Sequence, residues 1–276
     1  MQLLEMIFNN LDKLIFPLLV GSLLALTASL LGVVLVLKRY SMIGDGLSHV
    51  TFGVFAITLG LEFIDPDLSI FVVIPIVIVA AYFLLRLGES QRIKGDAAIG
   101  LISSAFLAVG YLVGSQTGFT RDIQSYMFGS IAFAGVEQLV IIAPISVIVV
   151  VSFIFLYHRI FAVTFDESFA KAIGIKTRVY NMIFACFTAV VIVVGIKIMG
   201  SLLISSIIIL PALSAMQVFT KFKKVIIASA IMSVACFIIA FFLFIEYSSG
   251  ASVVIVNLIC FIICAIIGAI RKKLAR

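Results

Sequence analysis

The sequence predicts an all-α polytopic membrane protein with eight or nine transmembrane helices. Two observations support this: 64% of the 276 residues are hydrophobic while only 12% are charged, and the apolar residues are grouped in long stretches. A typical soluble domain is about 45–50% apolar and about 25% charged, so this chain has too few charges to cover a water-facing surface. The composition excludes an ordinary soluble enzyme, a nucleic-acid-binding domain and a disordered chain.

Nine stretches have the roughly 20 apolar residues that a spanning helix needs. In chain order they are Ile15–Leu37, Ser41–Leu61, Leu68–Leu87, Ala97–Gly114, Gln138–Tyr157, Tyr180–Met199, Ser201–Phe219, Val225–Ile245 and Ala251–Ile270. Only Gly200 separates the sixth stretch from the seventh. Either both stretches cross the membrane fully, or one of them forms a broken, re-entrant segment. Residues 1–13 are expected to form a short interfacial segment, and the chain 1–276 to form one transmembrane domain.

The distribution of basic residues predicts the orientation. If the N-terminus is outside and the chain crosses nine times, only Lys13, Arg121 and Lys197 of the 19 basic residues fall outside. Cytoplasmic loops usually carry an excess of Lys and Arg. The sequence therefore predicts an outer N-terminus and a cytoplasmic C-terminus. The net charge of +6 is explained by this topology, and no nucleic-acid partner is expected.

The second stretch contains the strongest candidate for a functional site. Asp45 is the only acid well inside a predicted span, and His49 shares its helix face because the two residues are four apart. Counted from Arg39 at about 1.5 Å per residue, Asp45 lies roughly 9 Å deep and His49 roughly 15 Å deep. Ser48 borders this face. Carboxylate and imidazole suit a divalent first-row metal, but a packing lock and a proton relay are alternatives.

The seventh stretch offers oxygen atoms that can line an ion pathway. Pro211 has no N–H to donate to the carbonyl of Ile207, and Ser201 and Ser205 share a helix face. A helix broken here would present carbonyl and hydroxyl oxygens to a passing ion. An ordinary proline kink is an equal alternative.

The longest inner loop is expected to contain a short helix at about residues 165–174. Thr164 can cap this helix, Asp166 and Glu167 suit its first turn, and Gly174 suits its C-terminal end. Its apolar residues are spaced i, i+4 and i+8 at Phe165, Phe169 and Ile173. An apolar stripe on a surface helix needs a partner protein or a lipid surface.

Two further observations limit the chemistry. The sequence has no Walker A, HExxH, GxSxG or GxGxxG motif, so active transport would draw its energy from an ion gradient or from another subunit. The four cysteines lie in apolar spans. Cys260 and Cys264 share a helix face that can in principle hold a soft metal, but we interpret these cysteines as small apolar side chains.

Several blocks of the sequence resemble one known family. The run from Lys38 to His49 resembles the "GDALSHA" signature of the membrane permeases of zinc, manganese and iron ABC importers, with Gly46 in place of the usual alanine. The other blocks that resemble this family follow in family order at residues 126–129, 165–174, 200–205, 210–212 and 249–252.

This resemblance implies a homodimeric permease in the bacterial cytoplasmic (inner) membrane. It would work with cytoplasmic ATP-binding subunits and an extracytoplasmic metal-binding protein, and it would not itself be an enzyme. Asp45 and His49 would contact the transported ion, Zn²⁺ or Mn²⁺, with zinc favoured by the resemblance of residues 122–130. The chain would hold no permanent cofactor, and ATP would bind to the partner subunit.

The resemblance also assigns a role to the predicted loop helix. It would be the coupling helix, seated in a groove of the ATPase, with contacts from Phe165, Asp166, Glu167, Phe169, Ala170, Ile173 and Gly174. Two other functions stay open. A proton-coupled secondary transporter would use the same Asp/His pair without an ATPase, and an intramembrane metalloenzyme would need a fuller set of metal ligands.

Overall fold

The computed structural model describes residues 11–60, 69–88, 95–117, 129, 131, 134–243 and 249–274. These residues form helices and connecting turns, without a β-strand among them. The helices are α2 (Leu11–Leu37), α3 (Ile43–Gly60), α4 (Ser69–Gly88), α5 (Gly95–Thr117), α7 (Val136–Phe155), α8 (Tyr157–Phe165), α9 (Glu167–Ala172), α10 (Thr177–Met199), α11 (Ser201–Val218), α12 (Phe222–Leu243) and α13 (Ser249–Leu274).

The predicted all-helical membrane architecture is confirmed. Each of the nine predicted stretches lies on a helix, and eight of the described helices are long and apolar enough to cross a membrane. The ninth, α4, contributes the shorter apolar stretch Ser69–Leu84. The prediction for residues 1–13 falls mostly outside the described residues and stays a prediction; Leu11–Lys13 lie in the first turn of α2.

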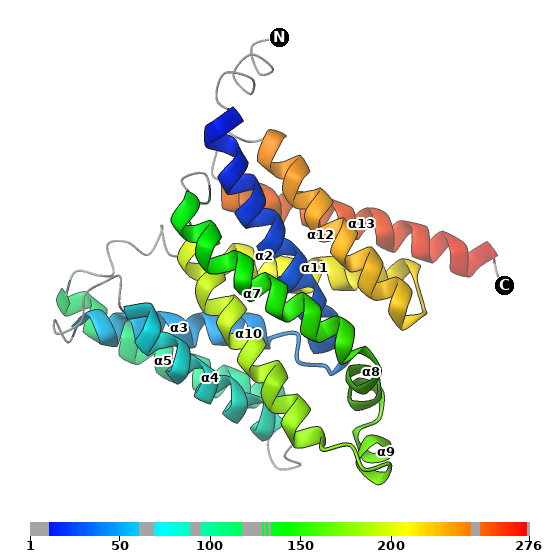
Figure 1. The fold of residues 1–276 in the computed structure, drawn as a ribbon, viewed down its shortest axis with the longest axis horizontal. Helices are drawn as coiled ribbons and strands as arrows, with labels where there is room; N and C mark the ends of the chain where they lie inside the picture. Colours follow the sequence, from blue (N-terminus) through cyan, green and yellow to red (C-terminus); the bar gives the residue numbers. More distant parts are fainter. Residues whose placement is uncertain are drawn as a thin grey trace.

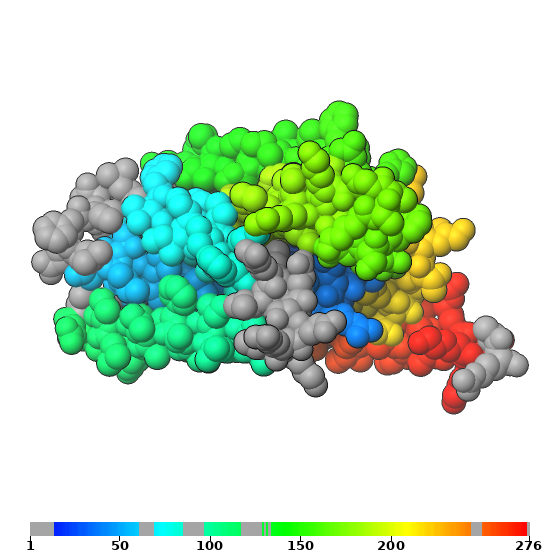
Figure 2. Space-filling view, turned by 90° about the horizontal axis from the view of Figure 1, so that it is seen from below, coloured from blue at the N-terminus to red at the C-terminus, as the bar shows by residue number. Residues whose placement is uncertain are grey.

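The helices are not equally enclosed. In both α2 and α3, 72% of the most apolar window is buried, whereas only 22% is buried in α7 and in α13. Figure 1 shows α3, α4 and α5 on one side of the molecule and α12 and α13 on the other. Seen from below, α5 and α13 lie at opposite ends of the surface (Figure 2). The helix that carries the Asp/His pair is therefore largely enclosed by its neighbours, while α7 and α13 present broad apolar faces to lipid.

Helix α2 packs mainly against α11 and α12, which are far away in the sequence. A Cβ atom on Gly32 would lie 1.8 Å from the carbonyl oxygen of Ile208, so the backbones of α2 and α11 are in direct contact. The hydroxyl of Ser233 on α12 donates a 2.8 Å hydrogen bond to the carbonyl of Ala25. The N-terminal helix is therefore held by the C-terminal half of the chain.

Glycines bring α3 directly against α5. A Cβ atom on Gly53 would lie 2.3 Å from the carbonyl oxygen of Phe106, and one on Gly46 would lie 2.4 Å from Cγ2 of Ile99. Small residues allow helix backbones to approach closely in membranes, where packing replaces the hydrophobic effect as the driving force. This contact fixes the rotation of α3 about its own axis.

A tight turn joins α2 to α3. The N–H of Tyr40 donates to the carbonyl of Leu35, and the N–H of Arg39 donates to that of Val36, as in a Schellman motif. Arg39 has a φ of 62° and occupies the left-handed region that usually needs glycine. Because the chain turns here, α3 begins only at Ile43. The helical rise counted from Arg39, on which the predicted depths of Asp45 and His49 depend, was therefore wrong.

The chain breaks between α10 and α11 at Gly200, which has a φ of 90°. Both helices have the length of a span, with 23 and 18 residues. Helix α11 continues through Pro211 without interruption, so the break predicted as one alternative at the proline does not occur. Gly129, with a φ of 63°, packs so closely that a Cβ atom would lie 2.5 Å from the backbone nitrogen of Gly200.

Candidate functional site

Asp45 and His49 lie together on α3. Nε2 of His49 is 3.6 Å from Oδ2 of Asp45, and the two side chains keep 41% and 49% of their surface exposed, respectively. Asp45 belongs to the first turn of α3, where the positive end of the helix dipole favours a carboxylate. The pair thus lies closer to the end of the helix than the sequence predicts, and its polar atoms are accessible.

The neighbouring helices determine where this pair faces. Gly46 packs against Ile99 of α5, while Gly44 lies beside Ser205 of α11. A Cβ atom on Gly44 would lie 3.9 Å from Cα of Ser205. At 3.6 residues per turn, positions 45 and 49 fall between these two contacts. The pair therefore occupies a strip of α3 that neither α5 nor α11 covers.

Ser48 and Ser205, both predicted as pathway residues, meet between α3 and α11. Their hydroxyl oxygens lie 3.3 Å apart, and both residues are buried. Ser48 Oγ donates a 2.8 Å hydrogen bond to the carbonyl of Gly44, so its proton is engaged and the Ser205 hydroxyl is the donor in the Ser205–Ser48 contact. These hydroxyls join the two helices one turn from Asp45.

The remaining pathway candidates lie along α11. Ser201 is the first residue of that helix and is partly buried. The side chain of Ile207 is fully buried and Pro211 is buried as well. A role for these three residues in an ion pathway stays a prediction.

The predicted loop helix exists but is shorter than residues 165–174. Helix α9 runs from Glu167 to Ala172, and its cap is Asp166, whose carboxylate accepts a 2.8 Å hydrogen bond from the N–H of Phe169. The expectation that Thr164 caps it was wrong, because Thr164 still belongs to α8. Gly174, with a φ of 85°, ends the helix as predicted.

The apolar stripe on this loop is divided between two helices. Phe165 ends α8 and packs edge-on against Phe222 at 5.6 Å between ring centroids. Phe169 and Ile173 follow after the Asp166 cap and stay 59% and 55% exposed. Ala170 points inward and is completely buried. The exposed apolar surface of α9 is therefore mainly Phe169 and Ile173.

A polar network that sequence reasoning missed connects α9 to the end of α2. Nζ of Lys38 donates to Oδ1 of Asn181 at 2.6 Å, and Nδ2 of Asn181 donates to Oε2 of Glu167 at 3.5 Å. Lys171 pairs with Oε1 of the same glutamate at 2.9 Å. Burial raises the pKa of Glu167, but the hydrogen bonds from Lys171 and Thr177 and the positive charge of Lys38 outweigh it, and the pKa falls below its ordinary value.

Other polar or hollow regions do not add metal ligands. Cys260 forms thiol contacts with Cys236 and Cys264, and the four cysteines are free. Across the part of the chain that the structure describes, no three His, Cys, Asp or Glu side chains are arranged to hold a metal ion. Asp45 and His49 stay the two predicted metal ligands, and a complete site would need others.

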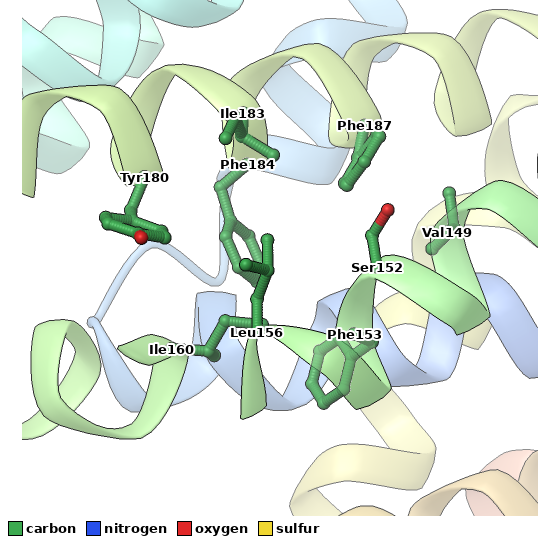
Figure 3. Close-up of a pocket in the computed structure, with 9 residues that line it drawn as sticks. All are labelled: Val149, Ser152, Phe153, Leu156, Ile160, Tyr180, Ile183, Phe184 and Phe187. Atoms are coloured by element: carbon green, nitrogen blue, oxygen red, sulfur yellow. The ribbon is translucent and has the colours of Figure 1, made fainter. Parts of the chain in front are cut away.

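A pocket between α7, α8 and α10 is apolar in character (Figure 3). Side chains of α10 face those of α7 and α8 across it, and hydroxyls come only from Ser152 and Tyr180. The lining residues are Val149, Ser152, Phe153, Leu156, Ile160, Tyr180, Ile183, Phe184 and Phe187. Without a carboxylate or an imidazole, this pocket does not resemble a cation site.

Two known membrane proteins are similar to this chain over most of its length. Manganese transport system membrane protein MntC of Bacillus subtilis (strain 168) is 28% identical over 222 residues, which cover 77% of this chain and 51% of MntC. The chain thus spans about half the length of that relative. High-affinity zinc uptake system membrane protein ZnuB of Buchnera aphidicola subsp. Acyrthosiphon pisum (strain APS) is 29% identical over 264 residues, covering 94% of this chain and 98% of ZnuB.

The fold is also that of a solved structure. A chain of PsaBC from Streptococcus pneumoniae in complex with Fab matches with a TM-score of 0.80 and 23% identity, covering 95% of each chain. A profile of the ABC 3 transport family matches residues 10–268. Together with the span-length apolar helices, these similarities identify a multi-pass membrane protein, and the chain belongs to the ABC 3 transport family.

Proposed function

We propose that this chain is the permease of an ATP-driven importer of a divalent transition metal in the bacterial cytoplasmic (inner) membrane. The observation that carries the proposal is the accessible Asp45–His49 pair on the largely buried helix α3, because a carboxylate and an imidazole are a ligand set for Zn²⁺ and Mn²⁺. The names of two relatives, a zinc uptake protein and a manganese transport protein, support this substrate class. Zinc is favoured, with manganese next.

The ligand count supports a homodimer. One chain offers two ligands, and two copies facing each other would offer two carboxylates and two imidazoles, the four ligands that a tetrahedral Zn²⁺ site uses. The outer surface of α5 carries the small, exposed residues Ser104 and Ala108 at i and i+4. Such a surface allows a second helix to approach closely.

The energy would come from a separate subunit. Helix α9 offers Phe169 and Ile173, both more than half exposed, to a groove on a cytoplasmic ATPase. ATP binding and hydrolysis there would move α9 and open the pathway alternately to the two sides of the membrane. An extracytoplasmic metal-binding protein would deliver the ion to Asp45 and His49.

The test is the metal content of cells. Metal-starved cells would receive zinc, manganese or iron, and wild type would be compared with Asp45→Ala at equal membrane levels by mass spectrometry. Glu137→Ala is the matched control, because it also removes one carboxylate but from an exposed position at the start of α7. We expect one metal to fail to recover only in Asp45→Ala.

Recovery of all three metals in Asp45→Ala would contradict metal import through this pair. A second arm deletes the partner ATPase. Uptake that depends on Asp45 but survives the deletion would replace the ATP-driven importer with a proton-coupled transporter.

A further inference from the structure

The asparagine side chain of Asn181 bridges two parts of the chain that are distant in sequence. Lys38 directly follows α2, Glu167 begins α9, and Asn181 stands between them near the start of α10. Both hydrogen bonds are made by the same amide group, one to each neighbour. One polar side chain in the first turns of α10 therefore connects three elements.

The chemistry of the three groups sets the direction of both hydrogen bonds. An ammonium group only donates, so Lys38 requires the amide oxygen of Asn181. A carboxylate only accepts, so Glu167 requires the amide nitrogen. The amide is thus a neutral group that satisfies a cation on one side and an anion on the other. An apolar or acidic side chain of the same size at position 181 would break at least one connection.

The bridge reaches the Asp/His pair over a short and stiff path. Lys38 begins the turn in which Arg39 takes the left-handed conformation, and the backbone hydrogen bonds of Arg39 and Tyr40 tie this turn to the last residues of α2. Further along, the N–H of Ile43 donates to the carbonyl of Tyr40, and Asp45 follows in the first turn of α3. A shift of Lys38 therefore moves the start of α3.

The opposite end of the bridge is anchored equally well. Asp166 caps α9 through the N–H of Phe169, and Ala170 is completely buried beneath the helix. Glu167 is held by Asn181 on one oxygen and by Lys171 on the other. Helix α9 can therefore move as a unit, with Glu167 as its link to α10 and α2.

We propose that the Lys38–Asn181–Glu167 bridge is the mechanical connection through which movement of α9 repositions Asp45 and His49. This inference rests on the proposed function, in which α9 contacts the ATPase. Asn181 is a positioning residue, because it contacts neither the ion nor the ATPase. Cutting the bridge separates ATP hydrolysis from ion movement while both partners stay bound.

The test uses the complete transporter, with its ATPase and metal-binding protein, in proteoliposomes supplied with Zn²⁺ or Mn²⁺ alone. The quantity measured is the number of ions taken up per ATP hydrolysed. Asn181→Asp keeps the acceptor for Lys38 but places a second carboxylate against Glu167. We expect it to lower this ratio about two- to thirty-fold, the range for residues in a coupling network.

A second substitution tests the bridge itself. In the double variant Asn181→Asp with Glu167→Gln, the new amide nitrogen donates to the new carboxylate, so the connection is restored in reverse and the ratio should return toward the wild-type value. Glu167→Gln alone keeps an acceptor for Asn181 and should change the ratio little. Lys171→Gln is the matched control, because it removes the other partner of Glu167 and leaves the bridge intact.

The outcomes separate the two proposals. If the wild-type complex takes up neither metal with ATP, the proposed function fails. If it does, and Asn181→Asp keeps the wild-type ratio, or the double variant fails to recover, the bridge is not the connection. Should Asn181→Asp fail to assemble, Lys38→Met removes the other end of the bridge, and an unchanged ratio in that variant overturns the proposal.

Discussion

The hydroxyl oxygens of Ser48 and Ser205 lie 3.3 Å apart and join α3 to α11 inside the protein. Because Ser48 already donates to the carbonyl of Gly44, Ser205 completes a chain of hydrogen bonds that ends in the first turn of α3. The backbones approach closely at this point, where Gly44 lies beside Ser205. The helix that carries the Asp/His pair is thus held by a polar contact on one edge and by glycine packing on the other.

Removing the Ser205 hydroxyl should weaken the contact between α3 and α11. We expect Ser205→Ala to destabilise the protein by about 1 kcal/mol, the usual net value of one hydrogen bond, as measured by thermal unfolding in detergent. Ser115→Ala serves as control, because that exposed hydroxyl bonds to the Leu112 carbonyl of its own helix. Equal melting temperatures for the two variants would show that the contact contributes no stability.

The glycine contacts between α3 and α5 should tolerate no side chain. A methyl group on Gly53 would collide with the backbone oxygen of Phe106 at 2.3 Å, so Gly53→Ala should cost about 1–3 kcal/mol or more. Gly100→Ala on α5 is the matched control, since a Cβ atom there has no neighbour within 4 Å. Melting temperatures should fall only for Gly53→Ala. A comparable loss in both variants would contradict the packing argument.

The exposed apolar residues of α9 should be needed for ATPase binding. We expect Phe169→Ala to weaken association with the partner ATPase by about 2 kcal/mol, the level of an interface hot spot, measured by co-purification and by titration in detergent. Phe155→Ala, at an 82% exposed position at the end of α7, should leave binding unchanged. A complex that survives Phe169→Ala at full affinity would exclude this surface as the contact.

The contacts that Glu167 makes at the start of α9 should weaken in acid. The pKa of Glu167 lies below its ordinary value of 4.5, so its ionised form contributes stability that is fully present above 4.5. This contribution is lost as the pH falls through the lower, folded-state pKa. Hydrogen exchange of residues 166–175, corrected for the intrinsic effect of pH, should therefore increase in acid. The increase should be smaller in Glu167→Gln, and an identical pH profile would rule out Glu167 as its cause.

Much of the fold follows from the sequence because a bilayer leaves few choices. A long apolar stretch in lipid must satisfy its backbone hydrogen bonds internally, so the helices could be predicted from hydropathy alone. The Asp45–His49 pair could be predicted for the same reason, since a spacing of four brings side chains together on any helix. Local periodicity is sufficient for both conclusions.

Contacts between distant residues could not be predicted in this way. Lys38 and Asn181 are 143 positions apart, and one sequence contains no signal that pairs them, although a lone asparagine in an apolar helix indicates a polar partner. The choice between Thr164 and Asp166 as the cap of α9 failed for a different reason. Both residue types cap helices, and packing of Phe165 against Phe222 extends α8 past Thr164.

The packing of α2 against α11 and α12 has a consequence for biogenesis. The partner atoms Ser233 Oγ and Ala25 O are separated by 208 residues; at about 5–20 residues per second, α2 must wait roughly 10–40 seconds after its synthesis for that partner to be made. During this interval its glycine-lined surface faces lipid or the insertion machinery. Chains that stop before α11 would leave this surface open, and we expect membrane quality control to degrade them rapidly.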